Sequence, residues 1–139
     1  MPVRFVDTNV LLYAVSTARD EAAKAGRARA LLAGRDLALS IQVLQEFYVQ
    51  ATRPTRADRL SHEQATALIE AWLRFPVGDL TASILRASLA SVERYRLAYW
   101  DAAIIESARA LGYATVLSED LSHGRDYDGV VVSNPFRSS

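Results

Sequence analysis

The stretch VRFVDTNVLLY, residues 3–13, contains the pattern that decides the fold. Its first four residues are an apolar-rich run of strand length that ends at Asp7. Asp7, Thr8 and Asn9 then supply side-chain oxygens that can cap a helix beginning near Val10. The stretch therefore predicts a short strand, an acidic turn and a helix in direct succession.

The rest of the chain alternates in the same way. We expect further helices over 20–32, 41–52, 61–75, 81–94 and 101–111, and further strands over 37–40, 114–117 and 130–132. The polar, arginine-rich segment 54–60 predicts an exposed loop, and segment 76–79 predicts a break between helices. Short strands separated by helices predict an α/β fold of three layers, in which a short, mainly parallel sheet is flanked by helices.

Composition limits the class of protein. A chain of 139 residues, 50% of them apolar and 23% charged, fits one domain over 1–139. No segment approaches the roughly 18 uninterrupted apolar residues of a membrane span, and the beginning of the chain lacks a signal-peptide pattern, so we expect a cytoplasmic protein. The absence of cysteine excludes disulfides and thiolate zinc sites. A formal net charge of zero argues against coating nucleic acid by bulk electrostatics.

Four acidic residues fall at positions that such a sheet would bring together. Asp7 and Asp120 follow predicted strands, and parallel strands end at the same edge of a sheet. Asp101 opens a predicted helix, and Glu46 lies about a turn and a half into another. Each also has a structural alternative: a helix cap for Asp7 and Asp101, solvated surface for Glu46, and a turn for Asp120. The functional interpretation depends on all four converging.

Converging carboxylates predict a metal site. Carboxylates close together repel one another, and their pKa values rise unless a cation is present. Oxygen ligands without cysteine or a histidine cluster suit hard ions, above all Mg²⁺ or Mn²⁺. A carboxylate-bound Mg²⁺ keeps several waters, binds substrate phosphates and lowers the pKa of an attacking water. These residues therefore predict phosphodiester hydrolysis without a nucleophilic side chain.

The same residues resemble a known family. The segments VDTNVLLY (6–13), YWDAAII (99–105) and LSEDL (117–121), together with the helical Glu46, are similar to PIN-domain ribonucleases. More narrowly, they resemble the VapC toxins of bacterial toxin–antitoxin pairs, part of which share the closing segment NPF (134–136). The resemblance extends over essentially the whole chain, and the order of the motifs is strongly specific.

The resemblance implies a role for each matching residue. Asp7 and Asp101 would be the principal metal ligands, and Glu46 and Asp120 would complete the acidic pocket. Three supporting residues would hold the site in shape: Thr8, Asn9 and Ser118. Glu119 is adjacent to Asp120, and the family's spacing from the serine selects Asp120; whether Glu119 contributes stays open.

The resemblance also implies partners and a cofactor. It predicts a PIN-like fold, Mg²⁺ with Mn²⁺ as a substitute, an RNA substrate, a cognate antitoxin protein whose C-terminal segment covers the active site, and a homodimer. Two alternatives remain open: a nuclease that acts on DNA, and a catalytically silent module that binds RNA or the antitoxin. A phosphoacceptor module is disfavoured because it needs a lysine near a late strand, and Lys24 is the only lysine.

The remaining polar and aromatic residues receive structural interpretations. We expect Trp72, Trp100, Phe47 and Tyr48 to be part of the core, because they occur within helical apolar patterns. The two histidines, His62 and His123, lie far apart and are expected at the surface or at a helix start. The arginines of the segment 53–59 are expected in a solvated loop, with contact to RNA phosphates as the alternative.

Overall fold

The computed structural model describes residues 2–137, so three residues of the expected domain 1–139 (Met1, Ser138 and Ser139) lie outside it. Its centre is a sheet of five strands, paired in parallel in the order β3-β2-β1-β4-β5. The strands are β1 (Arg4–Val6), β2 (Leu37–Ser40), β3 (Val77–Gly78), β4 (Thr115–Leu117) and β5 (Val131–Ser133). The prediction of a short, mainly parallel sheet is confirmed.

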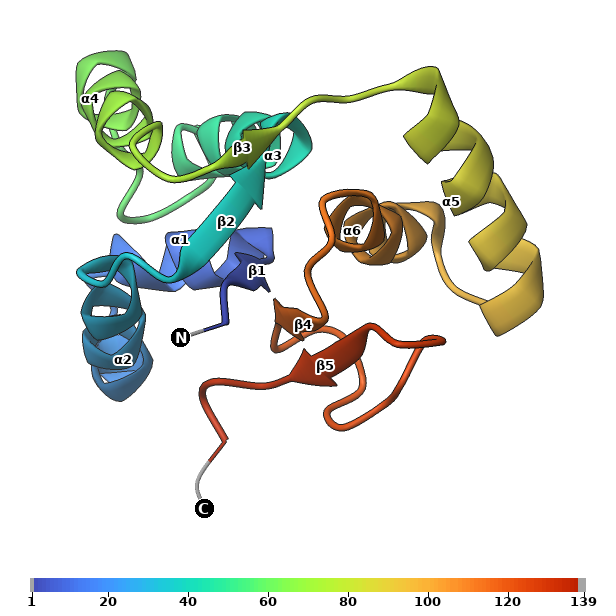
Figure 1. Ribbon diagram of the computed structural model, residues 1–139. Coiled ribbons are helices and arrows are strands. Elements are labelled where there is room, and N and C mark those ends of the chain that lie inside the picture. Colours follow the sequence, from blue (N-terminus) through green and yellow to red (C-terminus); the bar gives the residue numbers. More distant parts are fainter. Residues whose placement is uncertain (1, 138–139) are drawn as a thin grey trace.

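Helices cover both faces of this sheet. They are α1 (Thr8–Ala14), α2 (Ala22–Leu32), α3 (Ile41–Ala51), α4 (His62–Trp72), α5 (Ala82–Tyr95) and α6 (Tyr99–Ala110), with a short 3₁₀ helix (Arg19–Glu21) before α2. Figure 1 shows α1 and α2 on one side of the sheet and α5 and α6 on the other. The chain crosses from β1 to β2 and β3 in one direction and then reverses to β4, so right-handed crossovers place the helices before and after the reversal on opposite faces. The three-layer α/β/α architecture is confirmed.

The reversal of strand order creates the crevice that matters for function. The chain leaves β1 towards β2 on one side, and β4 joins β1 on the other side. The helices that follow these strands diverge at this point, which opens a crevice outside the carboxyl ends of β1 and β4. Asp7 directly follows β1, and Ser118 directly follows β4. The sheet therefore delivers two of the predicted site residues to its topological switch point.

The central strands are buried on both faces, which explains why they are continuous apolar runs in the sequence. Residues of the three inner strands have exposed fractions of at most 1%: Phe5, Val6, Leu37, Leu39, Val116 and Leu117. At the end of β2, the buried Ser40 hydroxyl accepts a hydrogen bond of 3.2 Å from the Val43 N–H and so caps α3. The helix that carries Glu46 therefore begins directly at the sheet edge. Within residues 2–137, every helix is too short or too polar to cross a membrane.

Two element predictions differ from the structure at their edges. Segment 76–79 ends a helix as expected, but Val77 and Gly78 also pair with β2 as the edge strand β3, and a two-residue strand shows no periodicity in sequence. The helix predicted over 101–111 begins at Tyr99, so Asp101 is not its cap but lies in its first turn. The expected loop over 54–60 contains turns and no helix or strand.

One core prediction is wrong. Phe47 and Trp72 are buried and pack edge-on with ring centroids 4.7 Å apart, and Tyr48 is half-buried against the core, as expected. Trp100 is 61% exposed. It falls in the first turn of α6, and apolar periodicity within a helix does not show whether a residue of that turn has a neighbour to pack against.

Candidate active site

Asp7 is the buried centre of the site. Its carboxylate is 6% exposed, and one oxygen accepts a hydrogen bond of 2.7 Å from the Thr8 N–H, so Asp7 also caps α1. The other oxygen accepts a hydrogen bond of 2.7 Å from the Ser118 hydroxyl. Both donors come from the ends of β1 and β4, which are neighbours in register. The same geometry therefore makes Asp7 a helix cap and leaves it at the site as a buried acid.

Asn9 connects the ends of β1 and β4. Its amide nitrogen donates to Asp7 Oδ2 at 3.3 Å and to Asp120 Oδ2 at 3.2 Å. Its amide oxygen accepts a hydrogen bond of 3.2 Å from the Glu119 N–H. Ser118 holds the same loop, because its hydroxyl oxygen accepts from the Asp120 N–H at 3.1 Å. Asn9 and Ser118, two of the three residues expected to support the site, therefore connect Asp7 with the loop that carries Asp120.

Glu46 reaches the site from the side of α3. The Thr8 hydroxyl donates to one Glu46 oxygen at 3.1 Å, which gives Thr8 the supporting position that was expected for it. The Gln42 amide donates to the other oxygen at 2.8 Å. Gln42 is buried one helical turn before Glu46, and sequence reasoning missed it. The i, i+4 spacing of a glutamine and a glutamate on one helix was the available signal.

Asp101 approaches from the opposite side, on α6. It lies in the first turn of that helix, where the positive end of the helix dipole favours a negative charge. Among residues 2–137, no hydrogen bond to its carboxylate is found. Asp7, Glu46 and Asp120 are each held by neutral donors, so Asp101 is the acid whose oxygens stay free for a ligand.

All four predicted acids open into one hollow of about 190 Å³. Its lining also includes the supporting residues Thr8 and Asn9, the polar side chain of Gln50 and the apolar side chains Leu12, Trp100 and Ile104. No basic side chain within residues 2–137 lines it. The four acids come from four separate segments of the chain, and the fold brings them together as the sequence predicted.

Burial and mutual repulsion change the acidity of these groups. Burial, partly offset by the hydrogen bonds from Ser118 and the Thr8 N–H and reinforced by Asp120 and Glu46, raises the pKa of Asp7 to about 6. Partial burial, with repulsion from Asp120 and Glu46, also raises the pKa of Asp101. The site therefore holds more negative charge than its own donors compensate, which is the electrostatic condition that a cation relieves.

Glu119 is directed away from the acidic hollow. It forms a salt bridge with Lys24 and accepts a hydrogen bond from the Tyr13 hydroxyl, and the Lys24 contact lowers its pKa against the effect of burial. Asp120 lines the acidic hollow and Glu119 does not, so the geometry agrees with the choice of Asp120. His123 is also outside the hollow; its Nδ1 accepts a hydrogen bond of 2.9 Å from the Asn134 N–H.

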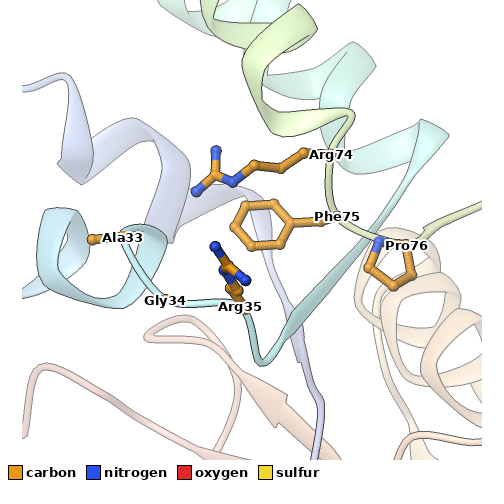
Figure 2. Close-up of a pocket in the computed structure, with 6 residues that line it drawn as sticks. All are labelled: Ala33, Gly34, Arg35, Arg74, Phe75 and Pro76. Carbon is orange, nitrogen blue, oxygen red and sulfur yellow. The ribbon is translucent and has the colours of Figure 1, made fainter.

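A larger hollow, of about 470 Å³, lies at the opposite edge of the sheet, before β2 and β3. Figure 2 shows Arg35 and Arg74 directed toward the Phe75 ring there. Arg74 already stacks on that ring and donates to the backbone carbonyls of Leu32 and Ala71. No acidic residue lines this second hollow, so it does not share the chemistry of the first.

The donor set of the acidic hollow fits a hard divalent cation. Every candidate ligand atom is a carboxylate, hydroxyl or amide oxygen, and the raised pKa values indicate uncompensated negative charge. Within residues 2–137, no three acidic or histidine side chains are close enough to form a ready-made cage. Mg²⁺ does not require one, because it binds through one or two carboxylates and keeps several waters.

A family model of the PIN domain matches residues 4–125. The chain belongs to the PIN domain family. Among curated proteins, no sequence matches it significantly. The matched segment contains all four acids and both strands of the switch point, so the family assignment covers the whole site.

Solved structures share this PIN fold at low sequence identity. A toxin–antitoxin complex from Klebsiella pneumoniae is 21% identical, with a TM-score of 0.67 and coverage of 95% of this chain and 97% of that one. VapC20 of Mycobacterium tuberculosis, a toxin that cleaves the sarcin–ricin loop, is also 21% identical, with a TM-score of 0.64 over 84% and 90% of the two chains. The structure of FitAB bound to a DNA fragment gives 16% identity and a TM-score of 0.71 over 99% and 98%.

The raised pKa of Asp7 predicts that ionisation of this one carboxyl group destabilises the metal-free PIN domain. Folded Asp7 binds its proton more tightly than the unfolded chain, whose pKa is near 3.8, so this stabilisation is complete below pH 3.8 and is lost as the pH rises through about 6. We expect Asp7→Asn to remove that loss, a gain of about 3 kcal/mol at pH 7 relative to the wild type. Urea unfolding in EDTA at several pH values measures it.

The matched control for this experiment is Asp128→Asn. Asp128 is exposed, lies outside the hollow and has a positive φ of 55°, which asparagine also tolerates. If the free energy of unfolding of Asp7→Asn changes with pH in parallel with those of the wild type and the control, ionisation of Asp7 does not destabilise the fold.

Proposed function

We propose that the chain is a Mg²⁺-dependent endoribonuclease that hydrolyses RNA phosphodiester bonds with a water as nucleophile. One observation carries this proposal: Asp7, Glu46, Asp101 and Asp120 line a single hollow at the switch point of the sheet. Among the described residues, the lining of the hollow contains neither a lysine that could contact a phosphoryl group on an aspartate nor a serine–histidine pair for a covalent route. Its chemistry favours hydrolysis assisted by a divalent cation.

Three of the four acids have a separate role in this proposal, and Asp120 completes the acidic pocket. Asp7 and Asp101 hold the ion, because one is preorganised by Ser118 and the other has free oxygens. Glu46, oriented by Thr8 and Gln42, accepts a hydrogen bond from the attacking water. When bound, Mg²⁺ supplies positive charge to the phosphate and acidifies that water. Mn²⁺ meets the same oxygen donors and is expected to replace it.

Further proposals concern the substrate and the protein partners. The RNA substrate is supported by VapC20, which shares the fold and is described as cleaving the sarcin–ricin loop. A cognate antitoxin, and a toxin role for this chain, are supported by the toxin–antitoxin complexes among the similar structures, which include VapBC2 of Rickettsia felis with 17% identity and a TM-score of 0.64. A homodimer is proposed by family resemblance. A short DNA-binding reading frame beside the gene would be the first test of the toxin role.

A third hollow, next to the acidic hollow, provides a place for the rest of the RNA strand. It shares Asn9, Leu12 and Asp120 with the acidic hollow and adds Arg56 together with Tyr13, Glu21 and Glu119, in a volume of about 190 Å³. Glu119 is already paired with Lys24, and Arg56 is the basic side chain of this lining. Arg56 comes from the expected exposed loop 54–60, and its guanidinium lies 3.0 Å from the Asp58 carboxylate. Asp58 in turn accepts a hydrogen bond of 2.8 Å from the Thr17 N–H, which fixes the loop to the body of the protein. We therefore favour phosphate contact for Arg56 over a purely solvated position.

Replacing a ligand tests the catalytic proposal. We expect Asp101→Asn to lower the rate of RNA cleavage by more than about 100-fold, since loss of mere outer-shell partners already costs 10–100-fold. Its fold should be intact, because the variant relieves repulsion with Asp120 and Glu46. Cleavage of a labelled RNA in Mg²⁺ measures the effect, and Asp128→Asn is the control. Full activity of Asp101→Asn would remove Asp101 from the ligand set.

Removing the metal is the second test. EDTA should stop cleavage completely, and excess Mg²⁺ or Mn²⁺ should restore it. The measurement is the initial rate of cleavage before chelation, after chelation and after each ion is added back. Cleavage that continues in chelator would contradict the metal-dependent mechanism.

Arginine substitutions test the path of the RNA strand. Arg56→Ala should raise KM several-fold with little change in kcat, and should make binding less dependent on salt, because one phosphate contact is lost. Arg53→Ala is the matched control, since Arg53 lies on the same segment, is exposed and lines neither hollow. Equal KM values for the two variants would place the strand elsewhere.

A further inference from the structure

Trp100 is an exposed indole at the rim of the acidic hollow. It is 61% exposed, whereas Trp72, the only other tryptophan, is 5% exposed. Burying a side chain of this size would favour folding, so its exposure does not contribute to the stability of the fold. The position is also specific, because Trp100 lines the same hollow as Asp7 and Asp101.

The surroundings hold this indole in place without covering it. Trp100 lies in the first turn of α6, directly before Asp101, so its backbone is as rigid as that of the acid. Its ring meets Tyr99 edge-on, with centroids 5.2 Å apart and an interplanar angle of 78°. Within residues 2–137, no other aromatic ring pairs with it, and no hydrogen bond of its indole N–H is found. An anchored aromatic surface beside a reactive centre is suited to a planar ligand.

We propose that Trp100 stacks on an unpaired base of the nucleotide next to the scissile phosphate. The inference rests on the proposed nuclease function, because a phosphate held at the acidic hollow brings an adjoining base to the rim. Proteins recognise single-stranded RNA by stacking its splayed bases on aromatic side chains, while bases inside a duplex already stack on one another. The substrate class is therefore RNA that is unpaired at the cleavage site, such as a loop or a single strand.

A second side chain of the same rim can read the stacked base. Gln50, on α3, lines the hollow one helical turn after Glu46 and is half-buried. Its amide offers both donors and an acceptor to the edge of a base. The stacking surface and the amide lie at the hollow that holds the four carboxylates, so a nucleotide whose phosphate is bound there through a divalent cation would bring its base to this rim.

Tryptophan fluorescence provides a readout that does not depend on catalysis. The probe is a ten-nucleotide single-stranded RNA of mixed sequence, with Ca²⁺ in place of Mg²⁺ to neutralise the carboxylates. We expect this RNA to quench the wild-type emission, and Trp100→Phe, which retains only the buried Trp72, to show no quenching. The same RNA annealed into a blunt duplex, and an abasic strand of equal length, should quench weakly. Quenching that persists in Trp100→Phe, or none in the wild type, would overturn the proposal.

Cleavage kinetics provide the second readout. Trp100→Ala should lower kcat/KM for the single-stranded RNA by roughly 5- to 150-fold, the range of one lost stacking interaction, and Trp100→Phe should retain most of the activity. Leu89→Ala is the control, since it removes an exposed apolar side chain of α5 that does not line the hollow. Equal kcat/KM for Trp100→Ala and the control would overturn the proposal.

The two readouts separate this inference from the function on which it rests. RNA quenching of Trp100 without cleavage by the wild type would refute the nuclease and retain the base platform. Cleavage with no effect of Trp100→Ala would retain the nuclease and refute the platform. If Trp100→Ala instead changes the oligomeric mass in gel filtration and leaves RNA quenching unchanged, the indole serves a protein contact and the proposal is wrong.

Discussion

The buried carboxylate of Asp7 is the constraint on which the rest of the site depends. Its pKa rises to about 6 because burial removes it from water and two other acids repel it. The fold keeps it in place with neutral donors from both sides of the switch point, the Thr8 N–H on β1's side and the Ser118 hydroxyl on β4's side. Because β1 and β4 are adjacent in parallel register, backbone pairing in the core positions the chemistry at the edge.

The four acids of the site differ in how they are held. Asp7, Glu46 and Asp120 are each oriented by hydrogen bonds from hydroxyl or amide groups, which fix a carboxylate without neutralising it. Asp101 has no such partner in the described part of the chain and enters from the opposite layer. The site thus combines three carboxylates that are oriented by hydrogen bonds with one carboxylate that has no such partner. Similar structures retain this fold at 16–21% identity, so a broad range of sequences can support it.

Sequence reasoning succeeded where a local pattern and a topological rule agreed. The strand before Asp7, the Ser61 cap of α4 and the convergence of four acids were all predictable, because caps are local and parallel strands end at one edge. It failed where the answer depended on a neighbour far along the chain. The edge strand Val77–Gly78 exists only through pairing with β2, and Gln42 matters only because its helix faces Thr8 across the site.

The sequence by itself determined the element order, the all-oxygen character of the site and the identity of its acids, since burial patterns, capping residues and ligand chemistry are properties of short segments. Only the tertiary structure decided where the neighbours of these acids lie. Glu119 turns to Lys24 while its neighbour Asp120 turns to Asn9, and Trp100 stands exposed in a helix of apolar pattern. The physical reason is that side-chain direction at a sheet edge is set by crossovers and register between distant segments, which no local periodicity contains.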